Sequence, residues 1–189
     1  MKKKKKKIFN AAVNQFSKKG ASSTTMSEIA KEAEVGKGTL YRYFENKEDL
    51  ISSLIKCGFK NITEEVKEKI SNVEEPVEKL KKSIEVQLKF YDQNRNFCRF
   101  LTREFWGYKN KFAENIEEIR NSYTVVIEDI IAQGKEEMIF KDLDPELAAV
   151  SLIGIVNITA LHWFMFKEEF SVDKIKEEVI EIYFNGLIR

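Results

Sequence analysis

The chain of 189 residues contains few of the residues that build tight turns, disulfides and catalytic centres. It has 2 prolines, 8 glycines, 2 cysteines and a single histidine. The scarcity of proline and glycine argues against β-rich and disordered classes. Cys57 and Cys98 stand apart, without a Cys-x-x-Cys spacing, so we interpret both as reduced thiols that pack like small hydrophobic residues.

The common enzyme motifs are also missing from the sequence. There is no glycine-rich phosphate loop, no Gly-x-Ser-x-Gly and no His-Glu-x-x-His. His162 has no second histidine to form a metal site, and we interpret it as a partly buried interface residue. The sequence therefore predicts no catalytic residues, no metal site and no cofactor, and a protein that is not an enzyme.

The two ends of the chain differ in charge. Residues 1–47 contain 12 Lys and Arg against 4 Asp and Glu, whereas residues 48–189 contain 20 against 27. A basic head on an acidic body fits a polyanionic partner for the head. Six consecutive lysines, Lys2–Lys7, contribute half of the basic residues of the head, and they fit either phosphate contacts or a solvated tail.

Residues 24–50 show the pattern of two short helices joined by a tight turn. Thr25 and Glu28 have the spacing of a capping box at the start of the first helix. The segment Ile8–Phe16 supplies a third helix against which both can pack. The apolar positions expected inside are Met26, Ile29, Ala30, Ala33, Val35, Leu40 and Phe44. The second short helix then keeps a polar, basic and aromatic face, as a helix-turn-helix does for the major groove of DNA.

Residues 8–50 resemble the DNA-binding domain of the TetR/AcrR family of repressors. The matching segments are Ile8 to Gly20, Thr25 to Ala33, Gly38 to Phe44 and Lys47 to Leu50. One departure is the turn Ala33-Glu34-Val35-Gly36, where the family has glycine and then a polar residue around the valine. If Glu34 takes the turn position with positive φ, the strain costs about 1 kcal/mol, which the fold should survive.

Candidate DNA contacts lie at the start of the first short helix and on the second. Lys37 and Arg42 can donate to guanine, and Thr39 can touch a thymine methyl group or a phosphate. The resemblance assigns phosphates to Tyr41, Tyr43 and Lys47, although both tyrosines also fit a packing role. The full predicted set is Thr25, Ser27, Lys37, Gly38, Thr39, Tyr41, Arg42, Tyr43 and Lys47.

The apolar segment Leu147–Phe166 is long enough to span a bilayer. Asn157 and His162 would be costly in lipid, the flanks are acidic and no second span exists, so we predict a soluble helix instead. A helix that is apolar on nearly all sides is buried both by its own body and by a partner. In the resembled family the two C-terminal helices form the dimer.

Aromatic residues are concentrated between Phe90 and Phe112. They fit a pocket for a flat or long apolar molecule, and equally an ordinary aromatic core. The resemblance implies a cavity in the body. The candidate effector-binding residues are Cys57, Phe100, Trp106, Tyr123 and Trp163.

Together these features predict an all-α cytoplasmic protein of about nine helices. Residues 1–47 form the helix-turn-helix domain, and residues 48–189 form a helical domain for effector binding and dimerisation. The resemblance implies a homodimer that binds a near-palindromic double-stranded DNA operator and is released by a small apolar or aromatic effector. The alternative is a structural DNA-binding protein with the same head and no effector.

Overall fold

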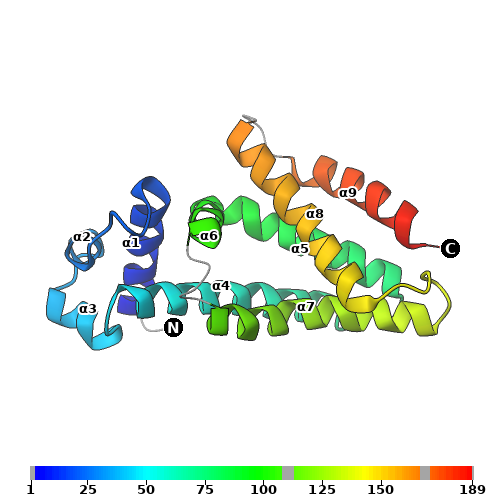
Figure 1. Cartoon of the computed structure of the whole chain (residues 1–189), viewed down its shortest axis with the longest axis horizontal. Helices are drawn as coiled ribbons and strands as arrows, with labels where there is room; N and C mark the ends of the chain where they lie inside the picture. Colours follow the sequence, from blue (N-terminus) through cyan, green and yellow to red (C-terminus); the bar gives the residue numbers. More distant parts are fainter. Residues whose placement is uncertain (1–2, 108–112, 167–170, 189) are drawn as a thin grey trace. The chain divides into compact units, whose positions relative to one another are not determined.

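The protein is all-α, which confirms the predicted fold class. The computed structural model describes residues 3–107, 113–166 and 171–188, apart from the side chains of residues 103–107, 113–121 and 165. This part of the chain contains nine helices and a single isolated β-bridge (Figure 1). The helices are α1 (Lys3–Lys19), α2 (Met26–Glu32), α3 (Lys37–Tyr43), α4 (Lys47–Ile70), α5 (Pro76–Gln93), α6 (Arg95–Gly107), α7 (Ala113–Glu136), α8 (Pro145–Phe166) and α9 (Val172–Leu187).

The chain folds into two compact units that do not follow one another simply along the sequence. The first unit comprises residues 1–58 and 94–116, and the second comprises residues 59–93 and 117–189. The first unit therefore contains α1 to α3, the start of α4 and the whole of α6. The division expected at residues 47 and 48 concerns function, and compactness alone does not test it.

The core of the first unit consists of apolar side chains from α1, α2, α3, α4 and α6. Phe16 on α1 is fully buried, and its ring stacks on that of Phe100 on α6 with a centroid distance of 5.2 Å. The helices α1 and α6 lie side by side (Figure 1). Gly58 on α4 allows another close approach, because a Cβ atom there would lie 2.2 Å from the Phe97 ring. Other core residues with at most 1% exposure are Ile8, Ala12, Ile29, Leu40, Phe44 and Leu50.

The turn between α2 and α3 is a Schellman motif. The Val35 N–H donates to the Ala30 carbonyl at 3.0 Å, and the Glu34 N–H donates to the Lys31 carbonyl at 3.2 Å. Glu34 occupies the position where glycine is usual and has φ 54°, so the condition under which the sequence implied backbone strain is met. Its carboxylate accepts a hydrogen bond from Lys7 Nζ at 2.7 Å, which ties the turn to α1.

In the second unit, α5 packs against α8 and α9, which also contact each other (Figure 1). A buried polar cluster joins three helices of this unit. The Tyr123 hydroxyl donates to Gln87 Oε1 at 3.0 Å, and Gln87 Nε2 donates to Asn157 Oδ1 at 2.9 Å. Burial raises the pKa of Tyr123 well above its ordinary value, so its hydroxyl stays a donor. The segment that follows α7 contacts the end of α9, where the Lys141 N–H donates to the Leu187 carbonyl at 2.9 Å.

The strain at Glu34 leads to a prediction about stability. Replacing Glu34 by Gly removes the left-handed strain together with the ion pair to Lys7, whereas Glu34→Gln removes the charge and keeps the strain. Because the freedom of glycine in the unfolded chain offsets part of the relief, we expect Glu34→Gly to exceed Glu34→Gln in stability by up to about 1 kcal/mol. Urea denaturation of both variants measures the difference. Equal stabilities would show that the strain at φ 54° is no larger than the cost of the freedom of glycine in the unfolded chain.

Candidate nucleic-acid interface

The short helix α3 has one buried residue and leaves most of its surface open. Of its seven residues only Leu40 is buried, at 0% exposure. Its N-cap is Gly36, which offers no side-chain hydrogen bond to the helix. Packing therefore uses one side of α3, and the rest of the helix is available for a partner.

The predicted contact residues of α3 lie together on this open surface. Lys37, Gly38 and Arg42 are exposed, Tyr41 is 52% exposed, and Thr39 is half-buried. Positions 37 and 41, and likewise 38 and 42, are four residues apart and share one helix face. The half-buried Tyr43 packs beside Phe44, and the Arg42 guanidinium lies 5.9 Å from the Tyr43 ring centroid. The face combines cations, hydroxyl groups and an aromatic ring, which suits a DNA groove.

Two glycines at the start of α3 are not explained by the packing of the protein. A Cβ atom on Gly36 or Gly38 would meet no heavy atom within 4 Å. Gly36 has φ −66°, which every residue type can adopt. The absence of side chains here keeps the backbone accessible, and it permits a close approach by an outside molecule.

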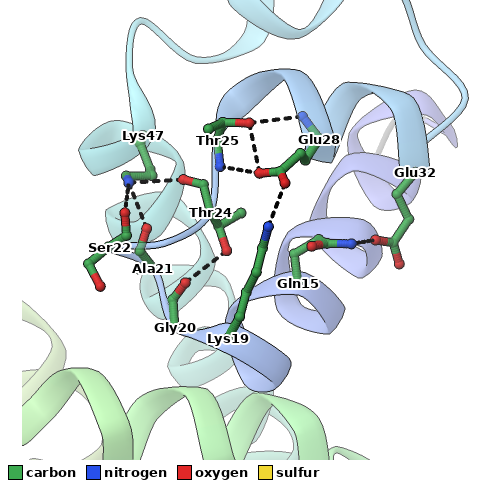
Figure 2. A network of polar contacts seen from close by, with 10 residues as sticks. All are labelled: Gln15, Lys19, Gly20, Ala21, Ser22, Thr24, Thr25, Glu28, Glu32 and Lys47. Carbon is green, nitrogen blue, oxygen red and sulfur yellow. Dashed lines mark hydrogen bonds and ion pairs between the residues drawn. The ribbon is translucent and has the colours of Figure 1, made fainter.

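The start of α2 is held by a complete capping box (Figure 2). Thr25 Oγ1 accepts from the Glu28 N–H at 3.3 Å, and Glu28 Oε2 accepts from the Thr25 N–H at 2.8 Å. Hydrogen bonds from Lys19 and then Thr25 lower the pKa of Glu28 to about 2, so the carboxylate is charged at neutral pH. The hydroxyl of Thr25 is thus engaged within the protein, whereas the predicted contact Ser27 is exposed.

Lys47 makes contacts that the sequence did not reveal. Its ammonium group donates to the carbonyl oxygens of Ala21 at 2.6 Å, Ser22 at 3.3 Å and Thr24 at 3.0 Å (Figure 2). These three bonds occupy all the donors of a lysine and fasten the first residue of α4 to the loop between α1 and α2. In the free protein Lys47 positions this loop, and a phosphate would have to compete with the three carbonyls.

The candidate effector residues are divided between the two compact units. Cys57 and Phe100 belong to the first unit, whereas Tyr123 and Trp163 belong to the second, and the Trp106 side chain lies outside the described residues. Phe100 is buried against Phe16, and Tyr123 is hydrogen-bonded to Gln87. Trp163 is half-buried beside the exposed His162. His162 is exposed in the single chain, and its predicted burial at an interface stays a prediction.

A groove of about 340 Å³ lies elsewhere in the second unit, between α8 and α9. It contains none of the candidate effector residues. Its lining is mainly apolar and includes Leu143, Leu147, Ala148, Ile155, Ile182 and Leu187.

The engagement of Lys47 generates a prediction that separates a structural role from a phosphate contact. Lys47→Met removes an ammonium donor from three carbonyls, two of them on the buried residues Ala21 and Thr24, although the Ala21 carbonyl still accepts from the Thr24 N–H at 3.2 Å. We expect a loss of about 1–3 kcal/mol in the free energy of unfolding without DNA. Lys31→Met, an exposed lysine on α2, is the matched control and should change stability by less than about 0.5 kcal/mol. If the two substitutions change the free energy of unfolding equally in urea denaturation, Lys47 has no structural role.

Comparison with known proteins gives the same assignment for both parts of the chain. Residues 8–54 match the model of bacterial regulatory proteins of the tetR family, and residues 73–187 match the tetracyclin repressor-like C-terminal domain. The fatty acid metabolism regulator protein of Bacillus subtilis (strain 168) is 28% identical over 181 residues, which cover 95% of this chain and 93% of that protein.

Two solved structures share the fold over nearly their whole length. The transcriptional regulator FadR from Bacillus subtilis, solved in complex with stearoyl-CoA, is 27% identical with a TM-score of 0.88, and the match covers 96% of this chain and 98% of that one. A Clostridium perfringens protein proposed to regulate fatty acid metabolism is 32% identical with a TM-score of 0.86, covering 97% and 99%. With both of its parts matched, the chain belongs to the TetR family of DNA-binding transcriptional regulators.

Proposed function

We propose that this regulator is a repressor that binds a palindromic operator as a homodimer and leaves it when a long-chain acyl-CoA binds. The observation that carries the DNA part of the proposal is the open face of α3, where Gly36 and Gly38 serve no packing purpose. No catalytic step belongs to this function. As in its bacterial relatives, the place of action is the cytoplasm, where the chromosome lies.

On the operator, α3 enters the major groove. Lys37 and Arg42 contact base edges, because their cationic donors suit guanine O6 and N7. Thr39, Tyr41 and Tyr43 contact phosphates or a thymine methyl group from the same helix. Ser27 offers its exposed hydroxyl from α2, and Thr25 contributes through the position that its capping box fixes. Lys47 acts first by holding the loop, and only secondarily on a phosphate.

Dimerisation through α8 and α9 is supported by their exposed apolar side chains. In the single chain, Leu147 is 67% exposed and Ile158 is 60% exposed on α8, and Ile182 is 63% exposed on α9. The stretch Pro145–Phe164 is long and apolar enough to cross a membrane, and 33% of its residues in the most apolar part are buried within the chain. One such helix among the described residues is weak support for a membrane span. A second copy of the chain would cover this surface in water. Two subunits related by a two-fold axis would then place two α3 helices on the half-sites of a palindrome.

An acyl-CoA is the effector class favoured by the relatives named for fatty acid metabolism. Its long chain is the apolar ligand that the aromatic residues of the body suggested. Tyr123 and Trp163 are candidate contacts from the second unit, and Cys57, Phe100 and Trp106 are candidates from the first. A ligand that reaches Phe100 would have to separate it from Phe16, on which it stacks at 5.2 Å.

Operator selection followed by effector titration tests the proposal. Duplexes bound from a random pool should converge on a palindrome, and light scattering should give the mass of a dimer. Stearoyl-CoA should then weaken binding to the selected duplex about 5–150-fold in fluorescence anisotropy. Butyryl-CoA and free coenzyme A are the controls and should have little effect.

The outcomes of this experiment separate the parts of the proposal. A selected palindrome that no acyl-CoA releases would favour the alternative, a structural DNA-binding protein without an effector. If no duplex is enriched from the pool, the proposal that α3 recognises an operator sequence is wrong.

Gly38→Ala tests whether the bare start of α3 serves DNA. Because no atom lies within 4 Å of the added Cβ, the variant should keep its stability or gain up to about 1 kcal/mol. Affinity for the selected operator should fall at least about tenfold, which is 1.4 kcal/mol, since the methyl group keeps the backbone from the duplex. Gly186→Ala on α9 has equally free space and is the control, with its dimer mass verified. Unchanged operator binding by Gly38→Ala would show that Gly38 does not approach DNA closely.

A further inference from the structure

The first two turns of α1 contain the lysines that neither the core nor the helix-turn-helix explains. The helix begins at Lys3, so lysines of the run belong to an ordered helix and not to a separate tail. Lys3, Lys4 and Lys6 are exposed. No ion pair joins these three ammonium groups to an acidic group in the described part of the chain.

The other two lysines of this helical segment anchor it to the helix-turn-helix. Lys5 Nζ lies 5.3 Å from the centroid of the Phe9 ring and 5.5 Å from that of Phe44, the residue that ends α3. Lys7 is paired with Glu34 in the turn that precedes α3. The lysine-rich start of α1 is therefore held next to both ends of the helix that carries the candidate DNA contacts.

Helical geometry separates Lys5 from the three exposed lysines. Lys5, Phe9 and Ala12 follow one another at intervals of four and three residues, so Lys5 shares the face that packs against the head. At 100° per residue, Lys3 lies nearly opposite Lys5, and Lys4 and Lys6 lie about 100° from Lys5 on either side. The three exposed ammonium groups therefore surround the start of α1, and we define Lys3, Lys4 and Lys6 together as the basic patch.

The basic patch is unfavourable for the isolated protein. The N-terminus of a helix carries partial positive charge, which disfavours cations there, and the first turn of α1 contains no acidic residue. Lysines three or four positions apart on one helix also repel each other. Packing does not require these charges, because the three side chains are exposed. A polyanion placed against the patch would add attractions to the lysines and to the helix N-terminus, and these would offset the repulsions.

We infer that Lys3, Lys4 and Lys6 bind the phosphates of duplex DNA that flank the half-site occupied by α3. This inference rests on the proposed operator binding and extends it, since it makes the bound duplex longer than the bases that α3 contacts. The contacts are to the DNA backbone only. They add affinity without adding preference for any base pair.

The test compares Lys3→Gln/Lys4→Gln/Lys6→Gln with a matched variant of the second unit, Lys67→Gln/Lys69→Gln/Lys82→Gln. Both remove three exposed lysines and change the net charge equally. Each is titrated with the selected operator, with the same operator shortened to its half-sites, and with a random-sequence duplex, at several salt concentrations. Circular dichroism verifies the fold, and the α1 variant should keep its helix because glutamine removes the repulsion.

The α1 variant should lose about eightfold in affinity per phosphate contact at 0.1 M salt, on the flanked operator and on the random duplex. The slope of log K against log salt should fall by about 1–3 for this variant and stay unchanged for the control. On the shortened operator the α1 variant should approach the unsubstituted protein, and the selected base preference should not change.

Two results would overturn the inference. One is an α1 variant whose slope of log K against log salt equals that of the unsubstituted protein, and which gains as much affinity from the flanking base pairs of the operator. The other is an equal loss in the control, which would assign the effect to net charge alone. The random duplex keeps the test decisive when no operator is enriched, so failure of the proposed function is distinguishable from failure of the patch.

Discussion

A helix of seven residues has no stability of its own in water, and the DNA-binding surface of this protein is built on one. Isolated helices shorter than about 12–15 residues are marginal, because each must offset the cost of its nucleus. The helix α3 has only Leu40 buried and has no side-chain cap. Its conformation therefore depends on its neighbours, and every other feature of the first unit can be understood as support for this short segment.

The support comes from contacts between residues that are distant in sequence. The Schellman motif at Glu34 fixes how the chain leaves α2, and the capping box at Thr25 fixes where α2 begins. Lys47 fastens the start of α4 to the loop before α2, and Lys19 reaches Glu28 from the end of α1. Each of these groups makes its contacts within the protein. As a result the outward side chains of α3 are not needed to hold the helix in place, and their chemistry can suit the DNA.

The sequence predicted what local patterns determine. Apolar periodicity and caps placed the first helices, since the predicted helix Ile8–Phe16 lies within α1 and α2 begins directly after the capping residue Thr25. The missing glycine in the turn identified Glu34 as the residue that could carry a positive φ, and the structure shows that it does. The role of Lys47 could not be predicted, because its three carbonyl partners lie 23 to 26 residues away. The same reason hid the packing of Phe100 on Phe16, which depends on α6 lying against α1 and leaves no periodic signal in either segment.

The course of the chain limits how an event in the second unit can alter the first. The chain passes between the units at residues 58 and 59, 93 and 94, and 116 and 117, and two of these passages lie inside α4 and α7. A continuous helix carries a displacement along its axis, because its backbone hydrogen bonds resist stretching. The first residue of α4 is Lys47, whose ammonium holds the loop before α2. We therefore expect a shift of α4 to act on the position of α2, and through the turn at Glu34 on α3. Under the proposed function, Lys47 would then couple the effector to the operator through the loop that it holds, in addition to its predicted phosphate contact.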